Sequence, residues 1–257
     1  MASSTLKHYH DEEFDSKLFN ETFFSHGGIS IIEENMVYPA KILHDLFSSG
    51  EVKGEILLDI SMGSIMYQLI SASNYFKDIY VLEFTDANLK HFKKWLAKEE
   101  GATDWSFACQ KVCEFEGIGD MSKEKEDQVR RKIKEVIKWE DYEKSCMSPQ
   151  LVPEVDCVLS LWVLIPISKT KKDFQRNLKE FTSRLKIGGH LILFVGLNMT
   201  FYKMGKHKYC FLSVDEDFVR ESVIKAGLVI EKVDSLPRKV DTDIVDYKHL
   251  LFVLARK

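Results

Sequence analysis

The chain has 257 residues, of which 45% are apolar and 30% are charged, so it is an ordinary globular chain and neither disordered nor collagen-like. Its 36 basic and 40 acidic side chains give a formal charge of -4 without a long run of one sign, and we expect no nucleic-acid partner. The length suits one large α/β domain with additions, and we expect a monomer.

No part of the sequence is suited to a membrane or to secretion. The longest apolar stretches, at 155–167 and 190–197, are too short to span a bilayer, and the N-terminus lacks the apolar core of a signal peptide. We therefore expect a cytoplasmic protein. Odd in number and without a CxxC pair, the five cysteines predict free thiols and no metal site; they are Cys109, Cys113, Cys146, Cys157 and Cys210.

The first half of the chain predicts an N-terminal cap followed by alternating elements. Residues 1–34 are polar with interleaved aromatic side chains and are assigned to the cap, and 35–257 to the main domain. Apolar residues at helical spacing predict a first helix over 35–47. The next elements are expected to be strands at 55–60 and 78–84, helices at 64–76 and 86–100, a third strand at 106–113, and a charged amphipathic helix at 122–136.

The second half continues the alternation and ends in two strands. A buried strand is expected at 155–164, then a helix over 174–185 closed by Gly188 and Gly189, and a strand at 190–195. Ser213 and Glu216 form a capping-box pattern that predicts a helix reaching 227. The last strands, at 228–233 and 249–254, are expected to pair antiparallel, so the fold class is α/β with a mostly parallel sheet.

Ligands in such a sheet lie beyond the carboxyl ends of the strands. The turn from Asp59 to Ser64 follows the first of these strands, where Gly63 permits close backbone approach. Glu83 ends the second strand, where a carboxylate can accept both hydroxyls of a ribose. Seen alone, the first feature would favour a routine strand-to-helix turn, and the second a surface glutamate.

Six stretches carry a more specific pattern, in order over nearly the whole chain: Asp59-Ile-Ser-Met-Gly-Ser-Ile-Met-Tyr67, Glu83-Phe-Thr-Asp-Ala-Asn88, residues 94–106, residues 112–117, Asp156-Cys-Val-Leu-Ser160 and Leu185-Lys-Ile-Gly-Gly-His190. They resemble the nicotinamide, phenylethanolamine and indolethylamine N-methyltransferase family. The resemblance implies a Rossmann-like class I methyltransferase fold: a mostly parallel seven-stranded sheet with a terminal antiparallel strand and an N-terminal helical cap. It also implies S-adenosylmethionine as cofactor and a small amine or heterocycle as methyl acceptor.

The resemblance carries over a set of cofactor-binding residues. Asp59 ends the first strand, Tyr67 lies along the cofactor, Glu83 holds the ribose in place of the more usual aspartate, and Asn88 borders the same sugar. Beside the adenine the resemblance places an acidic residue and its neighbour. The remaining cofactor residues that it implies are Glu140 and Asp141 at the adenine, with Phe19, Phe24, Ser61, Gly63 and Leu161.

Two departures from the family pattern affect the cofactor side. Ser61 replaces the first glycine of the turn, which costs about 1–2 kcal/mol if that position is left-handed. Its hydroxyl could instead contact the cofactor carboxylate. In the cap, Phe19, Phe23 and Phe24 stand where the family has tyrosines, so their rings either pack over a sulfonium or only fasten the cap to the core.

The acceptor side has lost acidic groups. Ile165 lies where the resemblance implies an acidic residue in several family members, and the stretch after the next strand contains no acidic residue. Asp246 remains as the one catalytic candidate; the alternative is that it is a solvated loop carboxylate. The apolar surroundings favour an aromatic acceptor that is neutral or weakly basic. The expected pocket residues are Ile165, Val195, Met199, Phe201 and Tyr202.

Two hypotheses of different class follow. The first is a small-molecule N-methyltransferase that uses S-adenosylmethionine and yields S-adenosylhomocysteine. The second is a catalytically impaired descendant that uses the old pocket to bind a ligand or a partner. A dinucleotide-dependent dehydrogenase is disfavoured, because the turn lacks the GxGxxG spacing.

Overall fold

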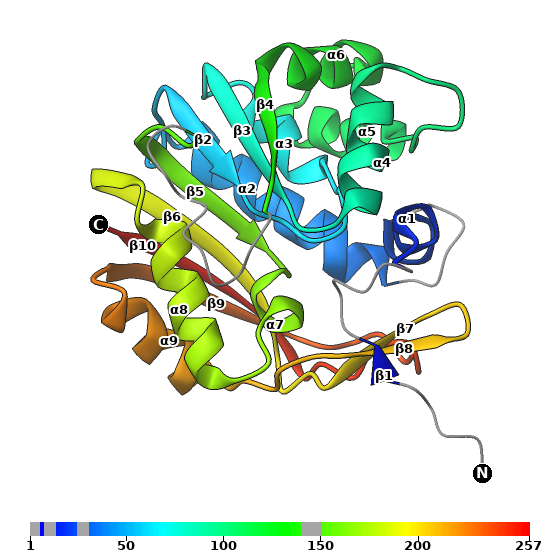
Figure 1. Cartoon of the computed structure of the whole chain (residues 1–257). Coiled ribbons are helices and arrows are strands. Elements are labelled where there is room, and N and C mark those ends of the chain that lie inside the picture. The colour runs from blue at the N-terminus through cyan, green and yellow to red at the C-terminus, as the bar shows by residue number, and fades with distance from the viewer. Residues whose placement is uncertain (1–5, 8–13, 25–30, 140–150) are drawn as a thin grey trace.

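The computed structural model describes residues 6–7, 14–24, 31–139 and 151–257, and a seven-stranded sheet forms its centre (Figure 1). The strand order is β4-β3-β2-β5-β6-β10-β9, and β10 runs antiparallel to both its neighbours while the pairs from β4 to β6 are parallel. The predicted fold class is thereby confirmed. The strands are β2 (Ile56–Asp59), β3 (Asp78–Glu83), β4 (Ile133–Lys138), β5 (Val155–Leu161), β6 (Leu185–Leu197), β9 (Val229–Pro237) and β10 (His249–Arg256).

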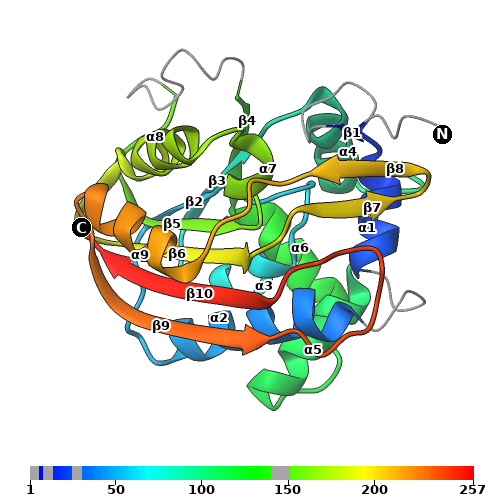
Figure 2. The same cartoon turned by 90° about the horizontal axis from the view of Figure 1, so that it is seen from below.

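Helices cover both faces of the sheet (Figures 1 and 2). One face carries α8 (Lys171–Thr182) and α9 (Glu216–Lys225), which contact each other. The opposite face carries α2 (Tyr38–Ser48), α3 (Tyr67–Ala72) and α5 (Ser106–Glu116), which also form one group. With both faces covered, the central strands are predominantly apolar and buried, as expected for buried parallel strands. The remaining helices are α1 (Ser16–Phe24), the π-helix η1 (Glu33–Val37), α4 (Asp86–Leu96), α6 (Ser122–Lys132) and α7 (Leu164–Ile167).

Two predictions in the middle of the chain were wrong. Residues 106–113, expected as a strand, belong to helix α5, because Ala108, Cys109, Val112 and Cys113 are buried at helical spacing. The helix expected over 122–136 ends at Lys132, and the missed strand β4 follows directly as a neighbour of β3. Its charged residues mask it in the sequence, since β4 lies at the edge of the sheet and is half exposed.

Three details of the second half also differ from the expectation. Gly188 and Gly189 do not end a helix but lie inside β6, where the pairing with β5 shifts register. Helix α9 is capped by Asp215, whose side chain accepts a hydrogen bond from Phe218 N at 2.8 Å, so the pattern at Ser213 is not its cap. A hairpin of β7 (Phe201–Met204) and β8 (His207–Cys210) was missed; it turns at Gly205 and pairs with β1 (Leu6–Lys7).

Helix α1 lies beside this hairpin and α4 (Figures 1 and 2). Phe19 and Phe23 of α1 are 4% exposed and belong to the same apolar core as the sheet. The division at residues 34 and 35 falls within η1 and stays a prediction. Within the described part of the chain, no helix has the length and apolar character needed to cross a membrane, and the described cysteines Cys109, Cys113, Cys157 and Cys210 are free.

Candidate active site

The carboxyl ends of β2, β3 and β5 meet above one edge of the sheet, and a buried carboxyl group ends β2 there. Asp59 is 1% exposed, and its two oxygens accept hydrogen bonds from Ser61 Oγ at 2.7 Å and from Gln68 Nε2 at 2.9 Å. Burial raises the pKa of Asp59 to about 7, and the two hydrogen bonds oppose this rise. The group therefore changes charge near neutral pH.

A second buried carboxyl group ends β3. Glu83 is 1% exposed and accepts hydrogen bonds from the Asn88 side chain and from the backbone of Phe84. Its Oε2 atom is buried without a hydrogen-bond partner among the described residues. Burial, and then the nearby charge of Asp59, raise the pKa of Glu83 well above its ordinary value. A buried oxygen of this kind is a vacant acceptor for hydroxyl groups of a ligand.

Asn88 lies next to Glu83 in the first turn of α4. Thr85 caps this helix by accepting a hydrogen bond from Asn88 N at 3.0 Å. The side-chain oxygen of Asn88 accepts a hydrogen bond from Ser16 Oγ of α1 at 2.6 Å. The expected ribose-side pair of a carboxylate and an amide is thus brought together, and α1 contacts one of the two groups.

The turn after β2 carries its left-handed geometry at Gly63 and Ser64, with φ angles of 79° and 54°. Ser61 is absent from the positive-φ residues of the described chain, so the strain expected at this position does not occur. Its Oγ donates to Asp59 and accepts a hydrogen bond from Leu161 N at 3.3 Å. The Ser61 hydroxyl therefore joins the ends of β2 and β5.

Tyr67, at the start of α3, connects the turn to η1. Its hydroxyl donates to Asn35 O at 2.7 Å and accepts from Trp162 Nε1 at 3.2 Å. Burial raises its pKa above the ordinary tyrosine range. This chain of hydrogen bonds fixes the π-helix of η1 relative to the end of β5, and π-helical turns are frequent at functional sites.

Helix α1 packs directly on the turn. The Phe19 ring lies so close to Gly63 that a Cβ on this glycine would be 2.2 Å from a ring carbon. Phe19 also contacts Phe23, Phe24 and Tyr202, with ring centroids 5.1–6.1 Å apart. The three cap phenylalanines thus form one buried aromatic cluster over the site.

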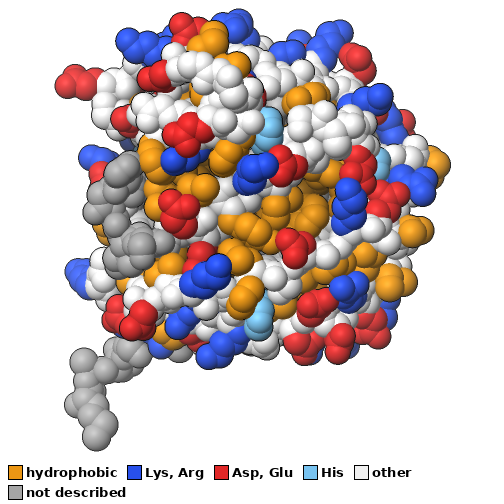
Figure 3. All heavy atoms as spheres, turned by 180° about the vertical axis from the view of Figure 1, so that it is seen from behind, with side chains coloured by type: hydrophobic (Ala, Val, Ile, Leu, Met, Phe, Trp, Pro, Cys, Tyr) orange, Lys and Arg blue, Asp and Glu red, His pale blue; other side chains and the backbone are white. Residues whose placement is uncertain are grey.

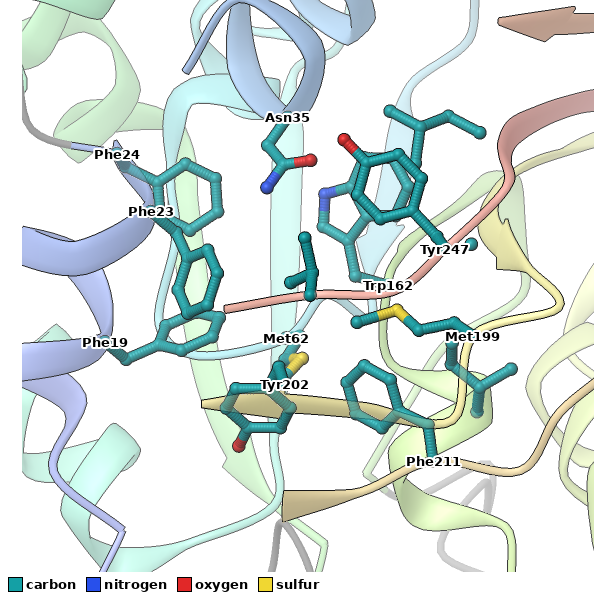
Figure 4. Close-up of a pocket in the computed structure, with 14 residues that line it drawn as sticks. Phe19, Phe23, Phe24, Asn35, Met62, Trp162, Met199, Tyr202, Phe211 and Tyr247 are labelled. Atoms are coloured by element: carbon teal, nitrogen blue, oxygen red, sulfur yellow. The ribbon is translucent and has the colours of Figure 1, made fainter. Parts of the chain in front are cut away.

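Beside this cluster lies an apolar cavity of about 50 Å³ (Figure 4). Of the expected pocket residues, Ile165, Met199 and Tyr202 line it, whereas Val195 and Phe201 do not. The cavity is small beside the roughly 300–1,000 Å³ of typical ligand pockets, so ligand entry requires movement of its walls. Its other lining residues are Phe19, Phe23, Phe24, Asn35, Met62, Trp162, Gly196, Phe211, Val245, Tyr247 and Leu250.

Several of these lining residues were not predicted from the sequence. Trp162 directly follows β5, and its position at the carboxyl end of a strand could have predicted its place at the site. Asn35 carried no such signal, because η1 presents it through an irregular helical turn. Its side chain points toward the cavity between Phe24 and Tyr247 (Figure 4) and makes no hydrogen bond to a described residue.

The acidic groups near the cavity are engaged elsewhere. Asp246 accepts hydrogen bonds from the backbone N–H groups of Thr200 and Phe201 and from the Thr200 hydroxyl, and it is not a lining residue. Glu34 accepts from the Tyr247 hydroxyl at 2.5 Å and from two backbone N–H groups of the loop at 239–240. The lining residues therefore include no carboxylate.

The remaining expected residues complete the picture. Leu161, at the end of β5, is fully buried, and its carbonyl accepts a hydrogen bond from Met62 N at 2.9 Å. Glu140 and Asp141 lie outside the described residues. On the face in Figure 3, acidic and basic side chains are both spread over the surface.

The donor set at this edge fits an adenosyl cofactor. Glu83 offers a buried oxygen without a described partner, Asn88 places an amide beside it, and Gly63 puts no side chain over the turn. The space over the turn is occupied by the Phe19 ring in this conformation. The chemistry of the residues thus suits the cofactor, provided that α1 moves.

Comparison with known proteins gives one consistent result. A model of the NNMT/PNMT/TEMT family matches residues 2–257. Indolethylamine N-methyltransferase of Oryctolagus cuniculus is 30% identical over 249 residues, which are 96% of this chain and 95% of that protein. Nicotinamide N-methyltransferase of Homo sapiens is 31% identical over 254 residues, or 98% and 96% of the two chains. Phenylethanolamine N-methyltransferase of Macaca mulatta is 34% identical over 230 residues, or 87% and 81%.

Solved structures of more distant proteins share the fold. A S-adenosylmethionine-dependent methyltransferase from Clostridium acetobutylicum aligns with a TM-score of 0.54 at 10% identity, over 86% of this chain and 91% of that chain. Magnesium protoporphyrin IX methyltransferase from Synechocystis with bound SAH aligns with a TM-score of 0.52 at 13% identity, over 93% and 92%. At these identities the likeness concerns the fold alone.

Proposed function

The chain belongs to the NNMT/PNMT/TEMT family over nearly its whole length, and from this premise we propose that it transfers the methyl group of S-adenosylmethionine to the nitrogen of a small aromatic or heterocyclic amine. The observation that carries the proposal is the retained acidic edge. Glu83 ends β3 with a buried oxygen that has no described partner. Such an oxygen can accept a hydrogen bond from a ribose hydroxyl.

The bound cofactor supplies an activated methyl group on a sulfonium, so the chain itself needs no nucleophile. Its residues align the acceptor and exclude water. Since the lining residues of the cavity include no carboxylate, a protonated amine gains no ion pair there. The acceptor nitrogen is therefore one that is uncharged at neutral pH, such as a ring nitrogen or a weakly basic aromatic amine.

Asn35 is the group that would orient such an acceptor. Its amide points into a cavity lined otherwise by aromatic and aliphatic side chains, and its backbone is held by the Tyr67 hydroxyl. A single polar group in an apolar pocket fixes the direction of a bound ring. We propose that the Asn35 amide forms a hydrogen bond with a polar substituent of the acceptor.

We further propose a cytoplasmic monomer without a nucleic-acid partner. The balanced charge supports the absence of a nucleic-acid partner, and the free cysteines among the described residues support a reducing compartment. Measurement of the molar mass in solution by light scattering tests the monomer.

Calorimetric titration with S-adenosylhomocysteine tests the cofactor site, and Glu83→Gln is the matched control. We expect the wild type to bind with higher affinity than the variant. Transfer is then followed by mass spectrometry with deuterated-methyl S-adenosylmethionine over nicotinamide, phenylethanolamine and indolethylamine. Absence of binding by both proteins contradicts the proposed function.

One observation favours a second function, the binding of an apolar ligand without transfer. The cavity is about 50 Å³ in volume, and the cap rings that border it carry no hydroxyl groups. For a protein of this kind we expect an apolar aromatic ligand to raise the melting temperature while no acceptor gains the label. Labelled product from any acceptor refutes this second function.

A further inference from the structure

Helix α1 contacts two of the residues that are proposed to hold the cofactor. The Ser16 hydroxyl donates to Asn88 Oδ1 at 2.6 Å, and the Phe19 ring lies against Gly63. The two contacts are one helical turn apart on the same helix, so a single movement of α1 makes or breaks both.

At Gly63, the Phe19 ring fills space over the backbone. Phe19 is 4% exposed, and a Cβ on Gly63 would be 2.2 Å and 2.5 Å from two of its ring carbons. Such approach is possible only at glycine. The bare backbone that would receive the cofactor is therefore covered by an aromatic ring from the same chain.

The contact at Asn88 occupies a polar group. Ser16 is 4% exposed, so its hydrogen bond to Asn88 is shielded from water. Asn88 also contributes to the hydrogen bonds of Glu83. The hydroxyl of Ser16 thus engages the side-chain oxygen of Asn88, one of the two groups proposed to border the ribose.

Outside the site, α1 is fastened by a third residue. Asn20 Nδ2 lies 3.4 Å from His91 Nε2 of α4 and 3.4 Å from Thr103 Oγ1. Asn20 does not line the cavity, and its hydrogen-bond partners His91 and Thr103 are not among the residues expected to hold the cofactor. Its substitution should therefore weaken the closed position of α1 without removing a group that is expected to hold the cofactor.

We propose that α1 is an intramolecular competitor of the cofactor: Phe19 and Ser16 occupy the turn and Asn88 in the closed state, and the cofactor binds only after α1 has moved away. This inference rests on the proposed function. The fraction of molecules in which α1 is open then sets the apparent affinity, because a ligand that binds one state alone is weakened by the rarity of that state.

Titration of four proteins with S-adenosylhomocysteine tests the inference: the wild type, Asn20→Ala, Ser16→Ala and Phe19→Ala. The controls are Lys17→Ala and Glu21→Ala, because these side chains lie on α1 with 66% and 56% of their surface exposed. We expect about threefold to tenfold tighter binding for Asn20→Ala and Ser16→Ala, since each loses hydrogen bonds of the closed state. The controls should match the wild type.

Phe19→Ala should bind about tenfold tighter or more, because it removes the whole ring. Weaker binding by Phe19→Ala and Asn20→Ala would overturn the inference, since α1 would then contribute to cofactor binding. Equal affinity of all proteins overturns the inference but leaves the proposed function intact. If none of the proteins binds, both fail. Should Phe19→Ala not fold, Asn20→Ala decides alone.

Hydrogen exchange of the wild type gives an independent reading without catalysis. If the cofactor displaces α1, the backbone amides of residues 16–24 exchange faster in the presence of S-adenosylhomocysteine. A helix that closes over bound cofactor would exchange more slowly instead. Slower or unchanged exchange at saturating ligand overturns the inference.

Discussion

Replacement of Glu83 by glutamine should change cofactor affinity and protein stability in opposite directions. The carboxyl group is 1% exposed, and its Oε2 has no described partner. A hydrogen bond from a ribose hydroxyl to a charged acceptor contributes about 1.5–3 kcal/mol. Loss of that charge should weaken the binding of S-adenosylhomocysteine by about 10- to 150-fold.

Without ligand, the same substitution should stabilise the protein. Glutamate and glutamine both leave one buried atom unpartnered, but only glutamate also buries a charge, which costs at least about 1 kcal/mol more. For a chain of this size each kcal/mol raises the melting temperature by roughly 2–4 °C. The gain in stability should be present at pH 8 and shrink at acid pH. Because the pKa of Glu83 is raised in the folded protein, its carboxyl group is protonated there at a higher pH than in the unfolded chain and no longer buries a charge.

Calorimetric titration and thermal melts at two pH values measure both effects. Glu83→Asp is the matched control, since it keeps the charge and shortens the side chain by one methylene. We expect this control to retain affinity within about tenfold. A Glu83→Gln protein that binds S-adenosylhomocysteine as tightly as the wild type would refute the assignment of Glu83 to the ribose.

Three further substitutions test the site. The pKa of Asp59 is raised to about 7 in the folded protein from an ordinary 3.8. The contribution of this carboxyl group to the free energy of unfolding is therefore fully present below about pH 4 and is lost as the pH rises through 7. The stability of Asp59→Asn relative to the wild type should therefore increase between pH 4 and pH 8, by up to about 4 kcal/mol, in urea titrations; a difference that is flat with pH contradicts this. Ser61→Gly should destabilise the protein by about 1–2 kcal/mol without improving cofactor affinity, because Ser61 does not have left-handed backbone geometry and forms hydrogen bonds with both Asp59 and Leu161. Tighter S-adenosylhomocysteine binding would show instead that the Ser61 side chain obstructs the turn. Asp246→Asn should lower the melting temperature by several degrees, because the carboxylate holds Thr200 and the following residue, and it should reduce labelled product equally for all acceptors; a loss confined to the more basic amines would place Asp246 at the acceptor.

The cofactor edge was predictable from the sequence because it depends on residues at strand ends. Asp59 and Glu83 each follow a short apolar run, and parallel strands bring their carboxyl ends to one edge whatever the rest of the chain does. The alternation of strands and helices predicted the sheet for the same local reason. Strand β4 escaped because an edge strand with charged side chains carries no apolar run.

The acceptor cavity was predictable only in part. Met199 and Tyr202 follow the end of β6, so their position came from the strand. Asn35 and Tyr247 enter from η1 and from the loop before β10, and their meeting depends on tertiary hydrogen bonds such as that between Tyr247 and Glu34. Contacts of this kind join residues more than 200 positions apart in sequence, and no local pattern encodes them.

The absent hydroxyl groups of the cap explain why α1 can close over the turn. A phenol at position 19 would place its hydroxyl in the buried surroundings of this ring, since Phe19 is 4% exposed and its ring edge lies against Gly63. A buried hydroxyl without a partner costs about 1–3 kcal/mol, whereas a plain ring packs there without that cost. The phenylalanines that stand where the resemblance implies tyrosines therefore also stabilise the closed conformation of α1. Affinity for the cofactor and closure of α1 are thus two consequences of the same aromatic side chains.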